Sequence, residues 1–99
     1  LCGNDQWAHG ALAACAAAGL NVPRDIALTG FDDEAFGAYG AVPLTTVAQP
    51  TEAMAERAVD MLFRLVRGET IPATEQLVKL PCRVVVRQSC GAAGAAGEW

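Results

Sequence analysis

An α/β fold, in which helices flank a parallel sheet, is the architecture that this sequence predicts. Short apolar segments alternate with helix-like segments, glycine or proline separates them, and one apolar run, residues 26–31, is typical of a buried parallel strand. The order strand, helix, strand, helix, strand requires right-handed crossovers between parallel strands. With 99 residues, the chain amounts to at most one ordinary domain.

The first helix is predicted over roughly residues 6–18. Asn4 and Asp5 form an N-cap pair before it, and Gly19 follows as a C-terminal stop. Its residues are apolar nearly all round, with no polar stripe. Such a helix is buried on both sides, either by its own fold or by a partner chain.

The strands are predicted from short apolar or β-branched runs between turn residues. A turn at 21–25 leads into the strand 26–31, and a second strand is expected at 43–49. Two further strands, 77–80 and 83–87, flank a Pro-Cys kink.

The second helix is predicted over roughly residues 52–67, where apolar positions recur at every third and fourth residue. Thr51 is expected to cap it, and Gly68 to end it. The low-complexity residues 91–99 are predicted to be a disordered tail.

Charge and composition exclude several classes of protein. Seven Lys and Arg against eleven Asp and Glu give a net charge of −4, which makes this segment a poor candidate for contacting DNA itself. No apolar stretch is long enough to span a bilayer, and no secretory signal pattern is visible, so no membrane partner is expected. The cysteines lack metal-binding spacing and are interpreted as reduced thiols of a cytoplasmic protein. They are Cys2, Cys15, Cys82 and Cys90.

No motif predicts catalysis. Asp5 and His9 are four residues apart, a spacing that suits a metal site or an acid–base pair. No third ligand follows, so an ordinary helix-surface histidine is the favoured interpretation. There is also no nucleophile elbow and no glycine-rich phosphate loop. We therefore expect no enzyme activity, no cofactor and no metal.

The acidic residues 32–34 directly follow the strand 26–31, and open α/β sheets bind ligands at the carboxyl ends of their strands. For Asp32, a ligand contact and a solvated turn are about equally favoured, whereas the next two residues are interpreted as a turn in which one of them caps a helix. A carboxylate can accept hydrogen bonds from two sugar hydroxyls. If residues 1–3 and 26–31 are parallel neighbours, Asn4 projects from the same edge as Asp32, and the two residues would line a binding cleft.

Five segments of the chain, in this order, resemble the lactose-repressor/galactose-repressor (LacI/GalR) family of bacterial transcription regulators. They are residues 4–12, 19–26, 30–33, 43–50 and 77–89, the last closing with Val-Val-Val-Arg-Gln-Ser. The resemblance implies that residues 1–90 are the C-terminal portion of an effector-binding domain with a periplasmic-binding-protein type I, Rossmann-like fold. The chain would then be a fragment of a two-lobed sensor, with roughly residues 50–70 in the other lobe.

The same resemblance implies a set of functional residues. Asp32 resembles the family's effector-contacting aspartate, Asn4 a second contact from the same lobe, and Gln49 a contact where the chain crosses between lobes. The effector would be a sugar or a related small molecule. The helix after Asn4 would pack against its twin in a homodimer, and DNA would be bound only through a helix-turn-helix outside this chain. The implied dimer contacts are His9, Leu12, Ala13 and Tyr39.

The alternative function is that of a periplasmic sugar-binding component of an ABC importer, which shares the fold and the cleft but binds no DNA. Four unpaired cysteines disfavour an oxidising compartment and therefore favour the regulator.

Overall fold

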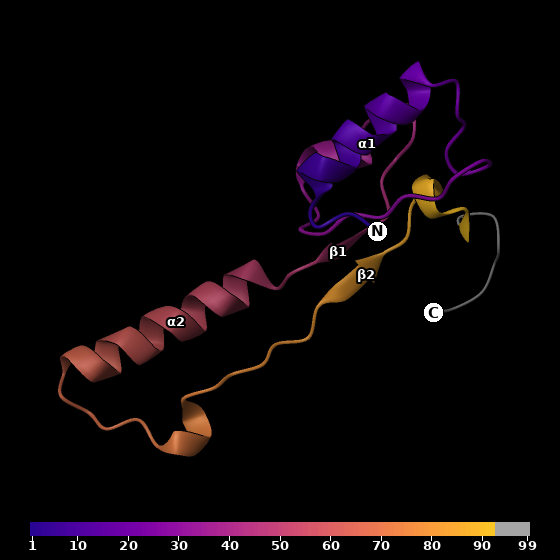
Figure 1. The fold of residues 1–99 in the computed structure, drawn as a ribbon. Coiled ribbons are helices and arrows are strands. Elements are labelled where there is room, and N and C mark those ends of the chain that lie inside the picture. The colour runs from indigo at the N-terminus through magenta and orange to yellow at the C-terminus, as the bar shows by residue number, and fades with distance from the viewer. Residues whose placement is uncertain (93–99) are drawn as a thin grey trace. The chain divides into compact units, whose positions relative to one another are not determined.

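The computed structural model describes residues 1–92, which divide into two compact units (Figure 1). The first unit contains Leu1–Ala48 and the described residues from Arg83 onward, and the second contains Gln49–Cys82. Most of the predicted tail, residues 93–99, lies outside the described residues. Within the described part of the chain, no helix has both the length and the apolar character needed to cross a membrane.

Helix α1 spans Asp5–Ala17, within one residue of the prediction. Asn4 is its N-cap, as expected, and the Asn4 Oδ1 atom accepts a hydrogen bond from the Trp7 backbone N–H at 2.8 Å. The described residues of this chain do not bury α1 on both sides, so the choice between the rest of its fold and a partner chain stays open. Only Asp5 and Ala8 are buried, and Trp7 is 70% exposed. The described residues therefore leave most of the alanine-rich surface of α1 uncovered.

The predicted strand 26–31 is present as an extended segment with one regular bridge. Thr29 bridges Thr45 in the parallel sense, whereas Leu28 donates its backbone N–H to Ser89 O at 2.9 Å. Because the segment divides its hydrogen bonds between different partners, it forms no continuous ladder.

The N-terminal residues run beside this segment. Cys2 N donates to Thr29 O and Asp5 N donates to Phe31 O, each at 2.8 Å. Donor and acceptor numbers rise together, so the two segments are parallel neighbours, as the sequence suggested. Their carboxyl ends consequently lie at the same edge.

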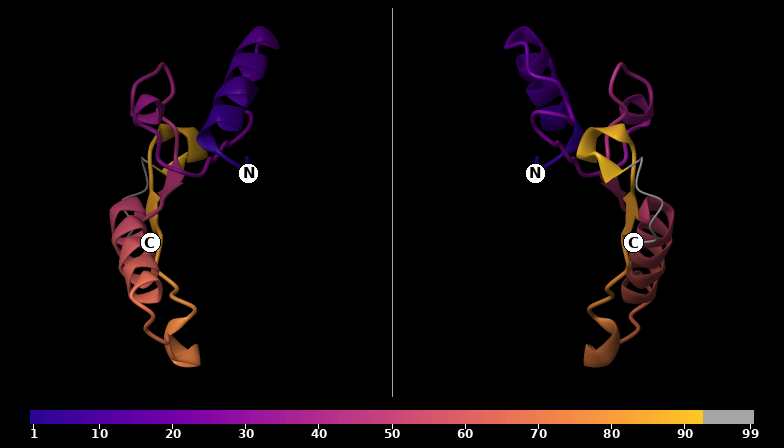
Figure 2. Two further views of the ribbon diagram at one scale, coloured as in Figure 1. Left: turned by 90° about the vertical axis from the view of Figure 1, so that its left-hand side faces the viewer. Right: turned by 90° about the vertical axis from the view of Figure 1, so that its right-hand side faces the viewer.

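The regular sheet is the antiparallel pair of β1, Thr46–Ala48, and β2, Arg83–Val85 (Figures 1 and 2). The Cα partners are Thr46 and Val85, Val47 and Val84, and Ala48 and Arg83. Both strands lie inside predicted ones, but the sequence did not indicate that they pair. The prediction of a strand at 77–80 is wrong. The described residues of the second unit contain no other strand with which this segment could pair.

Helix α2 spans Thr51–Val66 in the second unit. The predicted capping role of Thr51 is wrong, because Thr51 is already helical, Pro50 holds the N-cap position, and no side chain caps the helix. Gly68, with φ +80°, follows the C-terminus as expected. After the 3-10 helix Ala73–Glu75, the chain returns alongside α2 (Figure 2).

Polar residues slightly outnumber hydrophobic ones among the buried side chains of the first unit. The buried apolar residues there are Ala8, Leu28 and Leu44. The buried polar residues are Asp5, Thr45, Thr46 and Ser89. Ser89 Oγ donates to Leu28 O at 2.7 Å and accepts from Thr45 N at 2.8 Å. Specific hydrogen bonds, as well as apolar burial, therefore hold the interior of this unit together.

Candidate functional site

A pocket of about 240 Å³ opens at the strand-end edge of the first unit. The residues that line it are Asn4, Gln6, Asp32, Glu34 and Phe36. The structure thus brings together two of the three predicted effector contacts, Asn4 and Asp32. Gln49 begins the second unit, and its contact with an effector stays a prediction.

Asn4 offers mainly donors to this pocket. Its Oδ1 atom accepts the capping hydrogen bond from Trp7 N, whereas its Nδ2 group carries two N–H donors. Asp32, an exposed carboxylate, offers acceptors. A ligand whose polar groups both donate and accept, such as a polyol, matches this pair.

The backbone that carries Asp32 is unusual. Asp32 has φ 108° and Asp33 has φ 57°, both in a region that favours glycine. Each such non-glycine residue costs about 1–3 kcal/mol and persists only where its surroundings fix it. The site therefore depends on contacts that hold residues 32–34.

Asp5 supplies one of these contacts. Its side chain is fully buried, Oδ2 accepts a hydrogen bond from Glu34 N at 2.8 Å, and Oδ1 accepts one from Thr46 Oγ1 at 2.6 Å. The carboxylate also lies in the first turn of α1, where negative charge interacts favourably with the helix dipole. Sequence reasoning treated Asp5 as part of a cap pair and as a possible partner of His9, and so missed that it joins α1, β1 and the loop after Phe31.

Arg87 supplies another contact that the sequence did not reveal. Its Nη2 atom donates to Asp33 Oδ1 at 2.6 Å, and its Nη1 atom donates to Leu44 O at 2.9 Å. The interpretation of Asp33 as a solvated turn residue is therefore wrong. Glu34 holds the N-cap position of the 3-10 helix Ala35–Ala38 without a side-chain capping bond. A cation directly after three valines was the available signal, since such a charge usually needs a partner.

The predicted dimer contacts fall on two neighbouring elements. His9 and Leu12 are half-buried on α1, Ala13 is exposed there, and Tyr39, directly after the 3-10 helix, is 81% exposed. The His9 and Phe36 rings meet edge to face, with centroids 4.7 Å apart, which joins the two elements.

Asp5 and His9 do not act as a pair. Both Asp5 oxygens bond elsewhere, and the buried His9 Nε2 has no hydrogen-bond partner among the described residues. Residues 1–92 also contain no cluster of three His, Cys, Asp or Glu that could hold a metal ion.

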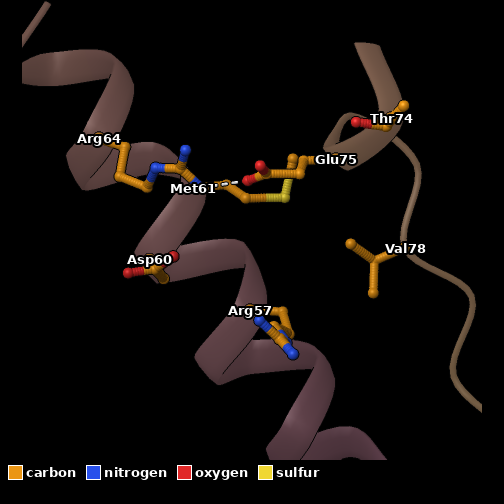
Figure 3. A pocket seen from close by; sticks show the side chains of 7 residues that line it. All are labelled: Arg57, Asp60, Met61, Arg64, Thr74, Glu75 and Val78. Atoms are coloured by element: carbon orange, nitrogen blue, oxygen red, sulfur yellow. Dashed lines mark hydrogen bonds and ion pairs between the residues drawn. The ribbon is translucent and has the colours of Figure 1, made fainter. Parts of the chain in front are cut away.

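The second unit has a pocket of about 220 Å³ of its own (Figure 3). Its lining residues are Arg57, Asp60, Met61, Arg64, Thr74, Glu75 and Val78. Arg64 donates to Glu75 at 2.9 Å and to Glu69 at 3.2 Å. Both hydrogen bonds raise the pKa of Arg64, and the bond to Glu75 has the larger effect. Because carboxylates of the same unit already hold this guanidinium, the pocket of the first unit is the stronger candidate for a ligand.

Comparison with known proteins identifies clear relatives. A family model described as the periplasmic binding protein-like domain matches residues 1–90. The HTH-type transcriptional repressor MelR of Bacillus subtilis (strain 168) is 43% identical over 88 residues, which are 89% of this chain and 25% of that protein. The chain spans about a quarter of the length of the curated relatives it matches.

Solved structures give the same result. The lac repressor dimer bound to operator and the anti-inducer ONPF has a TM-score of 0.78 at 33% identity, over 89% of this chain and 26% of that one. A LacI family transcriptional regulator from Arthrobacter sp. FB24, in complex with lactose, has a TM-score of 0.77 at 31% identity, over 89% of this chain and 33% of that one.

Proposed function

The chain belongs to the periplasmic-binding-protein-like domain family, and from this premise we propose that it is the effector-sensing and dimerisation segment of a DNA-binding transcription regulator. The helix-turn-helix that binds DNA lies outside this chain, and the intact regulator is a cytoplasmic homodimer. Its relatives are transcriptional repressors, which supports this function over that of an importer component or an enzyme. Roughly residues 50–70 belong to the other lobe of the sensor, and Gln49 contributes a third effector contact.

The convergence of Asn4 and Asp32 on one pocket is the observation that carries this proposal. The proposed effector is a sugar, because each of its hydroxyls can accept from the Asn4 amide and donate to the Asp32 carboxylate. The similarity to a regulator solved with lactose supports the same class of ligand. Binding changes the equilibrium between two states of the sensor and thereby the affinity for DNA.

Replacing Asp32 with alanine in the intact regulator should weaken sugar binding about 10- to 150-fold, because a hydrogen bond to a charged group contributes about 1.5–3 kcal/mol. Lactose, sucrose and glucose are titrated by calorimetry to find the sugar that the wild-type protein binds. DNA affinity is measured in parallel on an operator selected from a random library.

Glu56→Ala is the matched control, since it removes another exposed carboxylate, which lies on α2 and lines neither of the two pockets. It should bind sugar and operator as the wild type does. Asp32→Ala should keep its operator affinity and lose the response to sugar. An unchanged sugar affinity in Asp32→Ala would remove Asp32 from the site, and a wild-type protein that binds no operator would exclude a regulator.

We also propose that α1 forms the dimer interface around His9, Leu12 and Ala13, together with Tyr39. The uncovered apolar surface of α1 supports this, because the described residues leave most of that alanine-rich surface exposed.

Ala13→Glu should convert the dimer to a monomer, because it places a charge in an apolar interface where nothing pairs with it. Sedimentation velocity of the intact regulator measures this directly. Thr70→Glu, which adds the same charge at an exposed loop position of the second unit, should remain dimeric. A dimeric Ala13→Glu protein at micromolar concentration would place the interface elsewhere.

A further inference from the structure

We propose that Arg87 is a positioning residue for the effector site: it holds Asp33 and thereby keeps the backbone of Asp32 in the conformation that presents its carboxylate to the pocket. The inference rests on the proposed function, in which Asp32 binds the effector. Arg87 does not itself line the pocket. It acts through the neighbouring residue.

Arg87 is fixed at both of its ends. Its backbone N–H donates to Thr45 Oγ1 at 2.9 Å, and its backbone oxygen accepts from the same hydroxyl at 3.1 Å. Its guanidinium reaches Leu44 O and Asp33 Oδ1 with two different nitrogens. The residue is therefore a rigid link between the buried strand residues 44–45 and the loop.

Within the loop of residues 32–34, Asp33 depends most on the contact with Arg87. Asp32 N donates to Val47 O at 2.9 Å and Glu34 N donates to Asp5 Oδ2 at 2.8 Å, but Asp33 N is 3.4 Å from Thr46 Oγ1. The backbone hydrogen bond is thus weakest at the residue whose side chain Arg87 holds.

The ion pair of Arg87 and Asp33 also lies where solvent and salt weaken it little. The side chains of Arg87 and Asp33 are only 19% and 24% exposed, and their closest atoms are 2.6 Å apart. Partial burial limits screening by salt, and the planar guanidinium can donate to Asp33 and to Leu44 O at once. A lysine could restore the charge interaction, although its single nitrogen cannot reproduce the planar fork.

Loss of the guanidinium should therefore loosen the loop before it unfolds the protein. In the intact regulator, Arg87→Met should increase amide hydrogen exchange of residues 32–34 about 10-fold, the change expected for one charge-assisted hydrogen bond. It should raise the dissociation constant for lactose, or for whichever of sucrose and glucose the wild type binds better, by a similar factor.

Three further variants separate positioning from a general structural role. Arg87→Lys should recover most of the sugar affinity, and Asp33→Asn should lose affinity as Arg87→Met does. The double variant, Arg87→Met with Asp33→Asn, should be no weaker than either single variant, because both remove the same interaction. Operator affinity should stay at the wild-type value in all of them.

The outcomes that overturn the proposal are distinct from those that overturn the proposed function. Equal exchange at residues 32–34 in wild type and Arg87→Met would exclude positioning, whether or not any sugar binds. Faster exchange across the whole unit, with sugar affinity unchanged, would assign Arg87 a structural role alone. If no sugar binds the wild type, the sugar-sensing function fails, and the exchange data still decide whether Arg87 holds the loop.

Discussion

Asp5→Ala is expected to lower the free energy of unfolding by about 3–6 kcal/mol, because hydrogen bonds to a charged group contribute about 1.5–3 kcal/mol each. Asp5 is fully buried and accepts two of them, from Glu34 N and from Thr46 Oγ1. Alanine would leave the buried Thr46 hydroxyl and the part-buried Glu34 N–H without their acceptor, and it would also remove the negative charge from the first turn of α1. Urea unfolding of the intact protein measures the loss.

Two controls locate the effect. Asp5→Asn keeps the size of the side chain and one acceptor oxygen, so it should lose less than Asp5→Ala. Asp60→Ala removes an exposed carboxylate on α2 and should change stability by no more than about 0.5 kcal/mol. A loss below about 1 kcal/mol in Asp5→Ala would mean that water or another acceptor replaces the carboxylate.

The helices could be predicted from the sequence because their signals are local. The Asn4 cap and the three-and-four periodicity of 52–67 lie within a few residues of the hydrogen bonds they determine. The strands were harder. The segment predicted as a strand at 26–31 forms a single β-bridge, and the described residues contain no strand at 77–80. The reason is that a strand forms only where a partner strand is available.

The candidate site, too, has one part that the sequence predicts and one part that it does not. That Asn4 and Asp32 would meet could be predicted, since both follow strands and parallel strands share their carboxyl edge. The contacts that hold the loop could not, because Thr46 binds a residue 41 positions away and Arg87 binds one 54 positions away. No local pattern encodes such pairs.

Gly30→Ala tests the role of the Asp5 carboxylate by crowding it instead of removing it. The substitution should lower the free energy of unfolding by about 3 kcal/mol, the upper end of the usual range for overpacking a buried position. A Cβ atom on Gly30 would collide with Asp5 Oδ1 and would lie 3.2 Å from the Asp5 Cα atom and 3.1 Å from Leu44 Cδ2. The backbone atom cannot move aside cheaply, so the carboxylate must shift and its bond to Thr46 Oγ1 must lengthen.

The matched control is Gly37→Ala, at another buried glycine beside the same two side chains. Its Cβ would lie 3.7 Å from Asp5 Oδ2 and from Leu44 Cβ, both ordinary contacts, so its stability should stay within about 0.5 kcal/mol of the wild type. If strain at Gly30 acts through Asp5, adding Gly30→Ala to Asp5→Ala should cost much less than Gly30→Ala alone, because the colliding oxygen is gone. Full additivity in urea unfolding would show instead that the contacts of the added methyl group with the Asp5 Cα atom and the Leu44 side chain carry the cost, and that the carboxylate moves without losing its hydrogen bonds.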